Sequence, residues 1–162
     1  KQLSTLKVLG SEPIPTLDDI IDVINGSARL NIELKGKNTA EGVFFIMKKA
    51  IESGRWKAYQ LFVSSFDWDE LRDFKKLTTE FGIAVLTDKN PLDAIPVARE
   101  LNAFAINPKH SHLTQEIIND IHSEGFEIHT WTVNKKNRIE ELISWKVDGI
   151  ITDFPDRLKK KN

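Results

Sequence analysis

The chain has 162 residues, of which 40% are hydrophobic and 29% are charged, a length and balance that predict one globular domain rather than two. The net charge of −1 offers no electrostatic attraction for nucleic acid or an anionic membrane, and no apolar run reaches the roughly 18 residues that a membrane-spanning helix needs. Cysteine is absent, which excludes disulfides and thiolate metal sites and is consistent with a reducing compartment such as the cytoplasm. The first residue is Lys1 rather than Met, so either a signal peptide or a whole upstream segment is expected to have been removed.

Residues 1–10 show little periodicity and are expected to form a surface loop, and the two prolines within 11–15 exclude a helix there. Beyond that point, short apolar runs alternate with segments whose apolar residues recur at helical spacing. Six runs have strand character: 28–34, 61–64, 83–86, 103–106, 126–133 and 147–151. Six segments have helical character: 17–24, 40–53, 68–81, 92–101, 114–124 and 138–145.

Short polar residues and prolines mark several of these boundaries. Thr16, Thr39 and Asp67 are predicted N-caps, because a side-chain oxygen at that position accepts a hydrogen bond from the first turn of a helix. Pro96 is expected to kink or shorten the fourth helix, and Pro108 is expected to end the fourth strand.

The segment 30–36 alternates apolar and polar residues, so one face of the predicted strand carries Asn31, Glu33 and Lys35. Two interpretations are open. In an exposed edge strand of an ordinary sheet, this face would lie in solvent. Inside a barrel, Glu33 and Lys35 would lie side by side at the carboxyl end of the strand, where a carboxylate and an ammonium suit a metal ion and a phosphate.

The alternation of strands and amphipathic helices predicts an α/β fold with a parallel sheet covered by helices, because parallel strands need long crossover connections. Two architectures fit, a doubly wound sheet and a (β/α)8 barrel of the TIM type. The chain has neither G-x-G-x-x-G nor a P-loop, whereas polar residues follow nearly every predicted strand, as expected at the rim of a barrel. A complete barrel takes about 250 residues, so this chain is too short by roughly two strand–helix units.

Six short stretches span nearly the whole chain: 14–17 (Ile-Pro-Thr-Leu), 31–36 (Asn-Ile-Glu-Leu-Lys-Gly), 64–67 (Ser-Ser-Phe-Asp), 106–108 (Ile-Asn-Pro), 130–134 (Thr-Trp-Thr-Val-Asn) and 147–155 (Val-Asp-Gly-Ile-Ile-Thr-Asp-Phe-Pro). In sequence and order they resemble stretches of the glycerophosphodiester phosphodiesterases, a family of TIM-barrel hydrolases. The resemblance implies that residues 1–162 are a single partial barrel domain, containing roughly the third to eighth strand–helix units.

The resemblance also implies roles for four residues. Glu33 matches a glutamate that binds a divalent cation, calcium or magnesium, and such a cation polarises phosphoryl oxygens. Lys35 matches a lysine near the phosphate, where its charge would stabilise the transition state. Trp131 matches an aromatic residue of the alcohol pocket, and Phe66 would line the same pocket. Plain packing in the core is the alternative for both aromatic residues.

Three motifs of the family are missing: His-Arg-Gly on its first strand, the Glu-x-Asp pair on its second, and the His-Asp that follows. In the family these motifs hold the general acid and base histidines and the other metal carboxylates. The four histidines of this chain do not match them. His110 and His112 are expected to be solvated at the rim, His122 lies on a helix, and His129 is expected to be a hydrogen-bonded structural group in a strand.

The parent protein is therefore expected to hydrolyse glycerophosphodiesters to glycerol 3-phosphate and an alcohol, whereas this chain alone is expected to be inactive. The two edge strands, which hold Glu33 and Ile150, would stay open unless an N-terminal segment or a second chain completes the barrel. Two alternatives remain: a phospholipase D-like hydrolase of the same superfamily, and a non-catalytic or partner-completed barrel that binds phosphodiesters.

Overall fold

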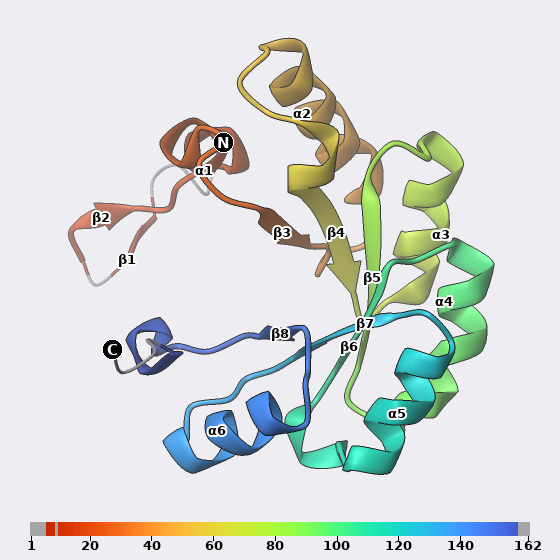
Figure 1. The fold of residues 1–162 in the computed structure, drawn as a ribbon. Helices are drawn as coiled ribbons and strands as arrows, with labels where there is room; N and C mark the ends of the chain where they lie inside the picture. The colour runs from red at the N-terminus through yellow and green to blue at the C-terminus, as the bar shows by residue number, and fades with distance from the viewer. Residues whose placement is uncertain (1–5, 9, 159–162) are drawn as a thin grey trace.

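A curved parallel sheet forms the centre of the fold. The computed structural model describes residues 6–8 and 10–158, and within them six parallel strands lie side by side in chain order, as predicted (Figure 1). Phe62 on the second of these strands contacts His129 on the fifth, with ring centroids 6.2 Å apart, so the sheet is curled. The strands are β3 (Leu30–Glu33), β4 (Leu61–Ser65), β5 (Gly82–Thr87), β6 (Ala105–Pro108), β7 (Glu127–Thr130) and β8 (Gly149–Ile150).

Helices lie on the outer side of this sheet (Figure 1). Their buried apolar side chains and those of the outward-facing strand residues form one continuous core. Within the part of the chain that the structure describes, none of the helices has the length and apolar character needed to span a bilayer. The α-helices are α1 (Leu17–Ile24), α2 (Ala40–Glu52), α3 (Trp68–Leu77), α4 (Ile95–Leu101), α5 (Gln115–Ser123) and α6 (Lys136–Ser144). Short 3₁₀ helices are η2 (Ala58–Gln60), η3 (Pro91–Ala94), η4 (His110–His112) and η5 (Pro155–Leu158).

Several local predictions are confirmed. The Thr16 hydroxyl accepts a hydrogen bond from the Asp19 amide at 3.2 Å, and the Asp19 carboxylate accepts one from the Thr16 amide at 2.8 Å. Asp67 caps α3 by accepting from the amide of Asp69 at 3.1 Å. Pro96 shortens its helix as expected. The α-helix begins only at Ile95, directly after η3 ends at Ala94, and the proline lies in the first turn of α4.

Two other local predictions are wrong. Thr39 occupies the N-cap position of α2, but its side chain makes no capping hydrogen bond and its hydroxyl donates to the carbonyl of Gly36 at 2.9 Å. Strand β6 does not end before Pro108 but includes it. Proline lacks only the backbone N–H donor. The Pro108 carbonyl still accepts hydrogen bonds from the Thr130 hydroxyl at 2.9 Å and from the Trp131 amide at 3.3 Å.

The structure also differs from expectation near the N-terminus and at the end of α3. Part of the expected surface loop forms an antiparallel pair, β1 (Lys7–Val8) with β2 (Glu12–Pro13). Helix α3 ends at Leu77 rather than at residue 81. Thr78 is extended there, and its hydroxyl accepts from the amide of Glu80 at 3.0 Å, a local turn that competes with the helix.

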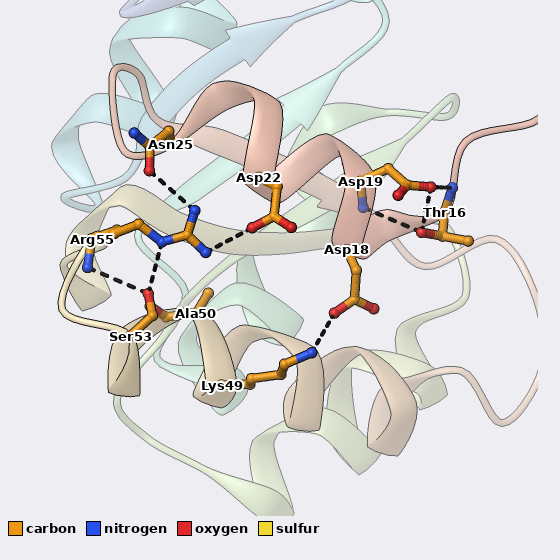
Figure 2. Close-up of polar contacts among 9 residues, drawn as sticks. All are labelled: Thr16, Asp18, Asp19, Asp22, Asn25, Lys49, Ala50, Ser53 and Arg55. Carbon is orange, nitrogen blue, oxygen red and sulfur yellow. Dashed lines mark hydrogen bonds and ion pairs between the residues drawn. The ribbon is translucent and has the colours of Figure 1, made fainter.

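Helix α1 is attached to α2 and the segment after it by the buried side chain of Ile21 and by two ion pairs. Figure 2 shows the ion pairs. Asp18 pairs with the Lys49 ammonium at 3.1 Å, and Asp22 pairs with the Arg55 guanidinium at 2.7 Å. Each pair is exposed and contributes about 0–1 kcal/mol. Ile21 is 4% exposed, and its burial contributes about 1.5–3 kcal/mol, so the apolar face of α1 is the stronger attachment.

Candidate active site

The inner face of the curved sheet is closed near the amino ends of the strands by a cluster of rings. Phe62 contacts Phe104 at 5.1 Å between ring centroids, and Phe104 contacts His129 at 5.6 Å. The Arg29 guanidinium lies 5.2 Å from the centre of the Phe62 ring and 5.1 Å from that of Phe104. His129 is also hydrogen-bonded, with Nε2 3.0 Å from a Glu127 oxygen. The expectation that His129 is hydrogen-bonded is therefore confirmed, and its structural role stays a prediction.

A hollow of about 430 Å³ adjoins this cluster. Residues of both edge strands, β3 and β8, border it, which places the two open edges of the sheet on the same side of the fold (Figure 1). The lining residues are Arg29, Asn31, Phe62, His129, Gly149, Ile150 and Ile151. The hollow thus lies between the ring cluster and the two edge strands.

Glu33 lies on this inner face, at the carboxyl end of β3, and Lys35 follows it in the loop after the strand. Asn31 lines the hollow, and residues two apart along a strand share a face. The Lys35 ammonium lies 3.7 Å from a Glu33 carboxylate oxygen, so the predicted adjacency is confirmed. The Lys35 side chain is 77% exposed and the Glu33 side chain 32% exposed. An ion pair this exposed contributes about 0–1 kcal/mol to stability. The pair therefore contributes little to stability, and both groups are accessible to a ligand.

An aromatic pair lies at the carboxyl ends of β4 and β7. The Phe66 and Trp131 rings meet edge to face, with centroids 5.2 Å apart and an interplanar angle of 88°. The Trp131 indole donates to the carbonyl of Asn107 at 2.8 Å, which fixes the ring orientation. Phe66 is 44% exposed and Trp131 is half-buried, so neither is a fully buried core residue. Together they form an apolar wall at the end of the sheet that also carries Glu33 and Lys35.

The histidines differ in environment. Burial, followed by the positive charges of Arg138, Lys109 and Lys135, lowers the pKa of His110. His110 is partly buried in η4 and His112 is exposed, so the expectation that both are solvated is confirmed for His112 and only in part for His110. On α5, His122 Nε2 lies 2.8 Å from an Asp148 oxygen.

The described residues do not make a complete metal site by themselves. Across 6–8 and 10–158, no group of three or more His, Asp or Glu side chains is arranged to hold a cation. Glu33 supplies one carboxylate, beside the Lys35 ammonium. Because calcium takes six to eight oxygen ligands and magnesium about six, Glu33 fits as one ligand only, and further ligands would have to come from elsewhere.

The sequence reasoning missed Glu70, which holds the loop after β3. Glu70 lies on α3, is 6% exposed, and accepts hydrogen bonds from the backbone amides of Asn38, Thr39 and Ala40. The local pattern Asp-x-x-Glu at 67–70 is typical of a capping box within one helix, so it gives no hint that this carboxylate reaches another helix.

Six consecutive parallel strands, of which the first five are each followed by an α-helix, carry polar and aromatic side chains at their carboxyl ends and define part of a TIM-barrel type α/β protein. The model of the glycerophosphoryl diester phosphodiesterase family matches residues 1–157. The chain belongs to this family.

Two relatives are similar in sequence, and both carry the name glycerophosphodiester phosphodiesterase. The protein of Caldanaerobacter subterraneus subsp. tengcongensis is 31% identical over 149 residues, which cover 91% of this chain and 61% of the relative. The protein of Bacillus altitudinis is 31% identical over 160 residues, which cover 93% of this chain and 63% of the relative. The chain thus spans about three fifths of the length of these curated relatives.

Solved structures show the same fold. A putative glycerophosphodiester phosphodiesterase from Galdieria sulphuraria matches with a TM-score of 0.83 at 22% identity. An Oleispira antarctica phosphodiesterase in complex with the product sn-glycerol-3-phosphate matches with a TM-score of 0.82, also at 22% identity. Each match covers 97% of this chain and 67% of the solved chain.

Proposed function

We propose that the whole protein hydrolyses glycerophosphodiesters to glycerol 3-phosphate and an alcohol. The observation that carries the proposal is the pairing of Glu33 with Lys35 at the carboxyl end of β3, with the aromatic wall of Phe66 and Trp131 at the same end of the sheet. The names of the sequence relatives and the glycerol 3-phosphate product of the Oleispira antarctica phosphodiesterase support this substrate class.

In this proposal each of the four residues contacts a part of the substrate or its metal ion. The Lys35 ammonium lies against the phosphoryl oxygens, where a positive charge stabilises the negative charge that develops in the transition state. Trp131 and Phe66 pack against the glycerol moiety. Glu33 provides one ligand for a calcium or magnesium ion, which when bound would polarise the phosphoryl oxygens. A general acid and base are not assigned to any residue of this chain.

The barrel is completed in this proposal by two further strand–helix units that pair with β3 and β8. Both are edge strands of the parallel sheet, and an uncovered edge invites pairing with another strand. The completing units would come from an N-terminal segment or a second chain. The 162 residues alone are expected to be inactive, because the metal ligands and proton-transfer groups are incomplete.

The test is turnover of glycerophosphocholine, in calcium or magnesium, by the longest form of the protein that its gene encodes. Lys35→Met is expected to lower kcat/KM by about 10²–10³-fold, because it removes a charge aimed at the transition state. Glu33→Gln is expected to weaken the apparent affinity for the metal. Lys37→Met, two residues along the same loop, is the matched control and should stay close to the parent. Unchanged turnover in Lys35→Met would remove this lysine from the site.

A phosphodiester-binding barrel without turnover is the second candidate. The observation that favours it is the lack, within 6–8 and 10–158, of a three-residue metal-ligand group. The same assay separates the two candidates when it is combined with binding of glycerol 3-phosphate by calorimetry. Binding without turnover in the longest form supports this second candidate.

A further inference from the structure

The loop between β3 and α2, residues 35–39, carries Lys35 and borders an open edge of the sheet. The residue before it is anchored to β4. The Leu34 amide donates to the Ser64 carbonyl at 2.7 Å, and the Ser65 hydroxyl donates to the Leu34 carbonyl at 2.6 Å. Beyond Leu34, in the described residues, the hydrogen bonds that join this loop to the rest of the fold end on Glu70.

The Glu70 carboxylate meets the loop at the N-terminus of α2. It accepts from the Thr39 amide at 3.0 Å, the Ala40 amide at 3.2 Å, and also from the Asn38 amide. The Thr39 and Ala40 amides are among the donors that a helix start leaves without partners. Glu70 thus does for α2 what the Thr39 side chain was expected to do.

A buried carboxylate is a costly way to cap a helix. Removing a carboxylate from water is strongly unfavourable unless hydrogen bonds and positive potential replace the lost hydration. Here the amides and the positive end of the α2 dipole supply that replacement. A threonine hydroxyl at position 39 would cap α2 without burying a charge. Unlike a local cap, the Glu70 carboxylate also ties the loop to α3.

We propose that Glu70 is a positioning residue for the phosphate-binding edge of the site. Its carboxylate fixes the loop that carries Lys35, and thereby the direction of the Lys35 ammonium relative to Glu33. The inference rests on the proposed function for the role of Lys35. It adds to that function a residue of α3 that does not touch the substrate.

Chemical rescue tests this role. Glu70→Ala empties the carboxylate position, which borders a surface hollow of about 290 Å³ lined in part by Asn38, Ala40 and Glu41. Added acetate can enter there and accept from the same amides, whereas acetamide has a similar shape and no charge. In NMR spectra of the longest encoded form, the amide signals of Asn38, Thr39 and Ala40 should shift in Glu70→Ala and return with acetate, but not with acetamide.

Turnover gives the second measurement. Glu70→Ala is expected to lower kcat by about tenfold to a hundredfold, as a misplaced catalytic group does, and acetate should restore most of the loss. Glu100→Gln is the matched control, because Glu100 forms a bidentate pair with Arg72 on the exposed side of α3 at 2.7 and 2.8 Å. This variant should lose some thermal stability and keep its kcat.

The outcomes separate the possibilities. If Glu70→Ala keeps kcat within twofold, or if acetate restores its melting temperature but not its kcat, Glu70 is a helix cap only and the proposal is overturned. If Glu70→Ala does not fold, Glu70→Gln replaces it, since the side-chain volume is kept and one acceptor remains. A parent protein without turnover refutes the proposed function instead, and the amide signals then still decide whether Glu70 holds the loop.

Discussion

Replacing Gly149 with alanine would test how tightly β7 and β8 pack on the inner face. A Cβ atom at residue 149 would lie 2.6 Å from Cδ2 and 3.0 Å from Cγ of His129. Carbon atoms in favourable contact are about 3.5–4.0 Å apart. The two residues face each other in the parallel pairing of β7 with β8, so the backbones cannot separate without breaking that pairing.

The expected cost follows from this overlap. Overpacking of a fitted contact costs about 1–3 kcal/mol, and each kcal/mol lowers the melting temperature of a chain of this size by roughly 2–4 °C. His129→Ala removes the ring and with it the overlap. In the double variant, Gly149→Ala should therefore cost nothing further, and it can regain up to about 1 kcal/mol because alanine restricts the unfolded chain more than glycine does.

The assay is urea unfolding followed by circular dichroism for the parent, both single variants and the double variant. A coupling free energy of about 1–3 kcal/mol is expected between the two positions. Gly42→Ala is the control, because nothing lies within 4 Å of the added atom in α2, and it should stabilise the protein by about 0.4–1 kcal/mol. A Gly149→Ala variant as stable as the parent, or single costs that simply add, would refute the reasoning.

Three further predictions concern other parts of the fold. Burial lowers the pKa of His110, so the unfolded chain binds more protons than the folded one as pH falls below about 6.5. The melting temperature should therefore drop towards pH 5, and His110→Gln should reduce this drop. Phe74→Ala, at a fully buried position of α3, should lower the free energy of unfolding by about 3–5 kcal/mol, measured by urea titration. Glu100→Gln, which breaks the pair with Arg72, should lower the melting temperature slightly at low salt, and the difference should shrink in 1 M NaCl, where screening is strong. An equal loss at both salt concentrations would contradict a surface ion pair.

Local patterns were sufficient for several interactions between residues that are close in the chain. The Thr16 and Asp67 caps depend on groups two or three residues away, and both are present as predicted. The alternation of residues 30–35 placed Glu33 and Lys35 on one face, and their 3.7 Å separation agrees. Where two local interactions compete, the pattern was less reliable, as at Thr78, whose hydroxyl forms a turn that ends α3 early.

The amino-acid sequence by itself determined the order of strands and helices, the parallel arrangement and the family, because these follow from periodicity, crossover length and short motifs. The tertiary structure alone decided which distant side chains meet. The curl of the sheet brings Phe66 to Trp131, and the packing of α3 on α2 brings Glu70 to amides about 30 residues earlier in the chain. Such contacts depend on how packed elements are placed in space, and spacing along the chain does not contain that information.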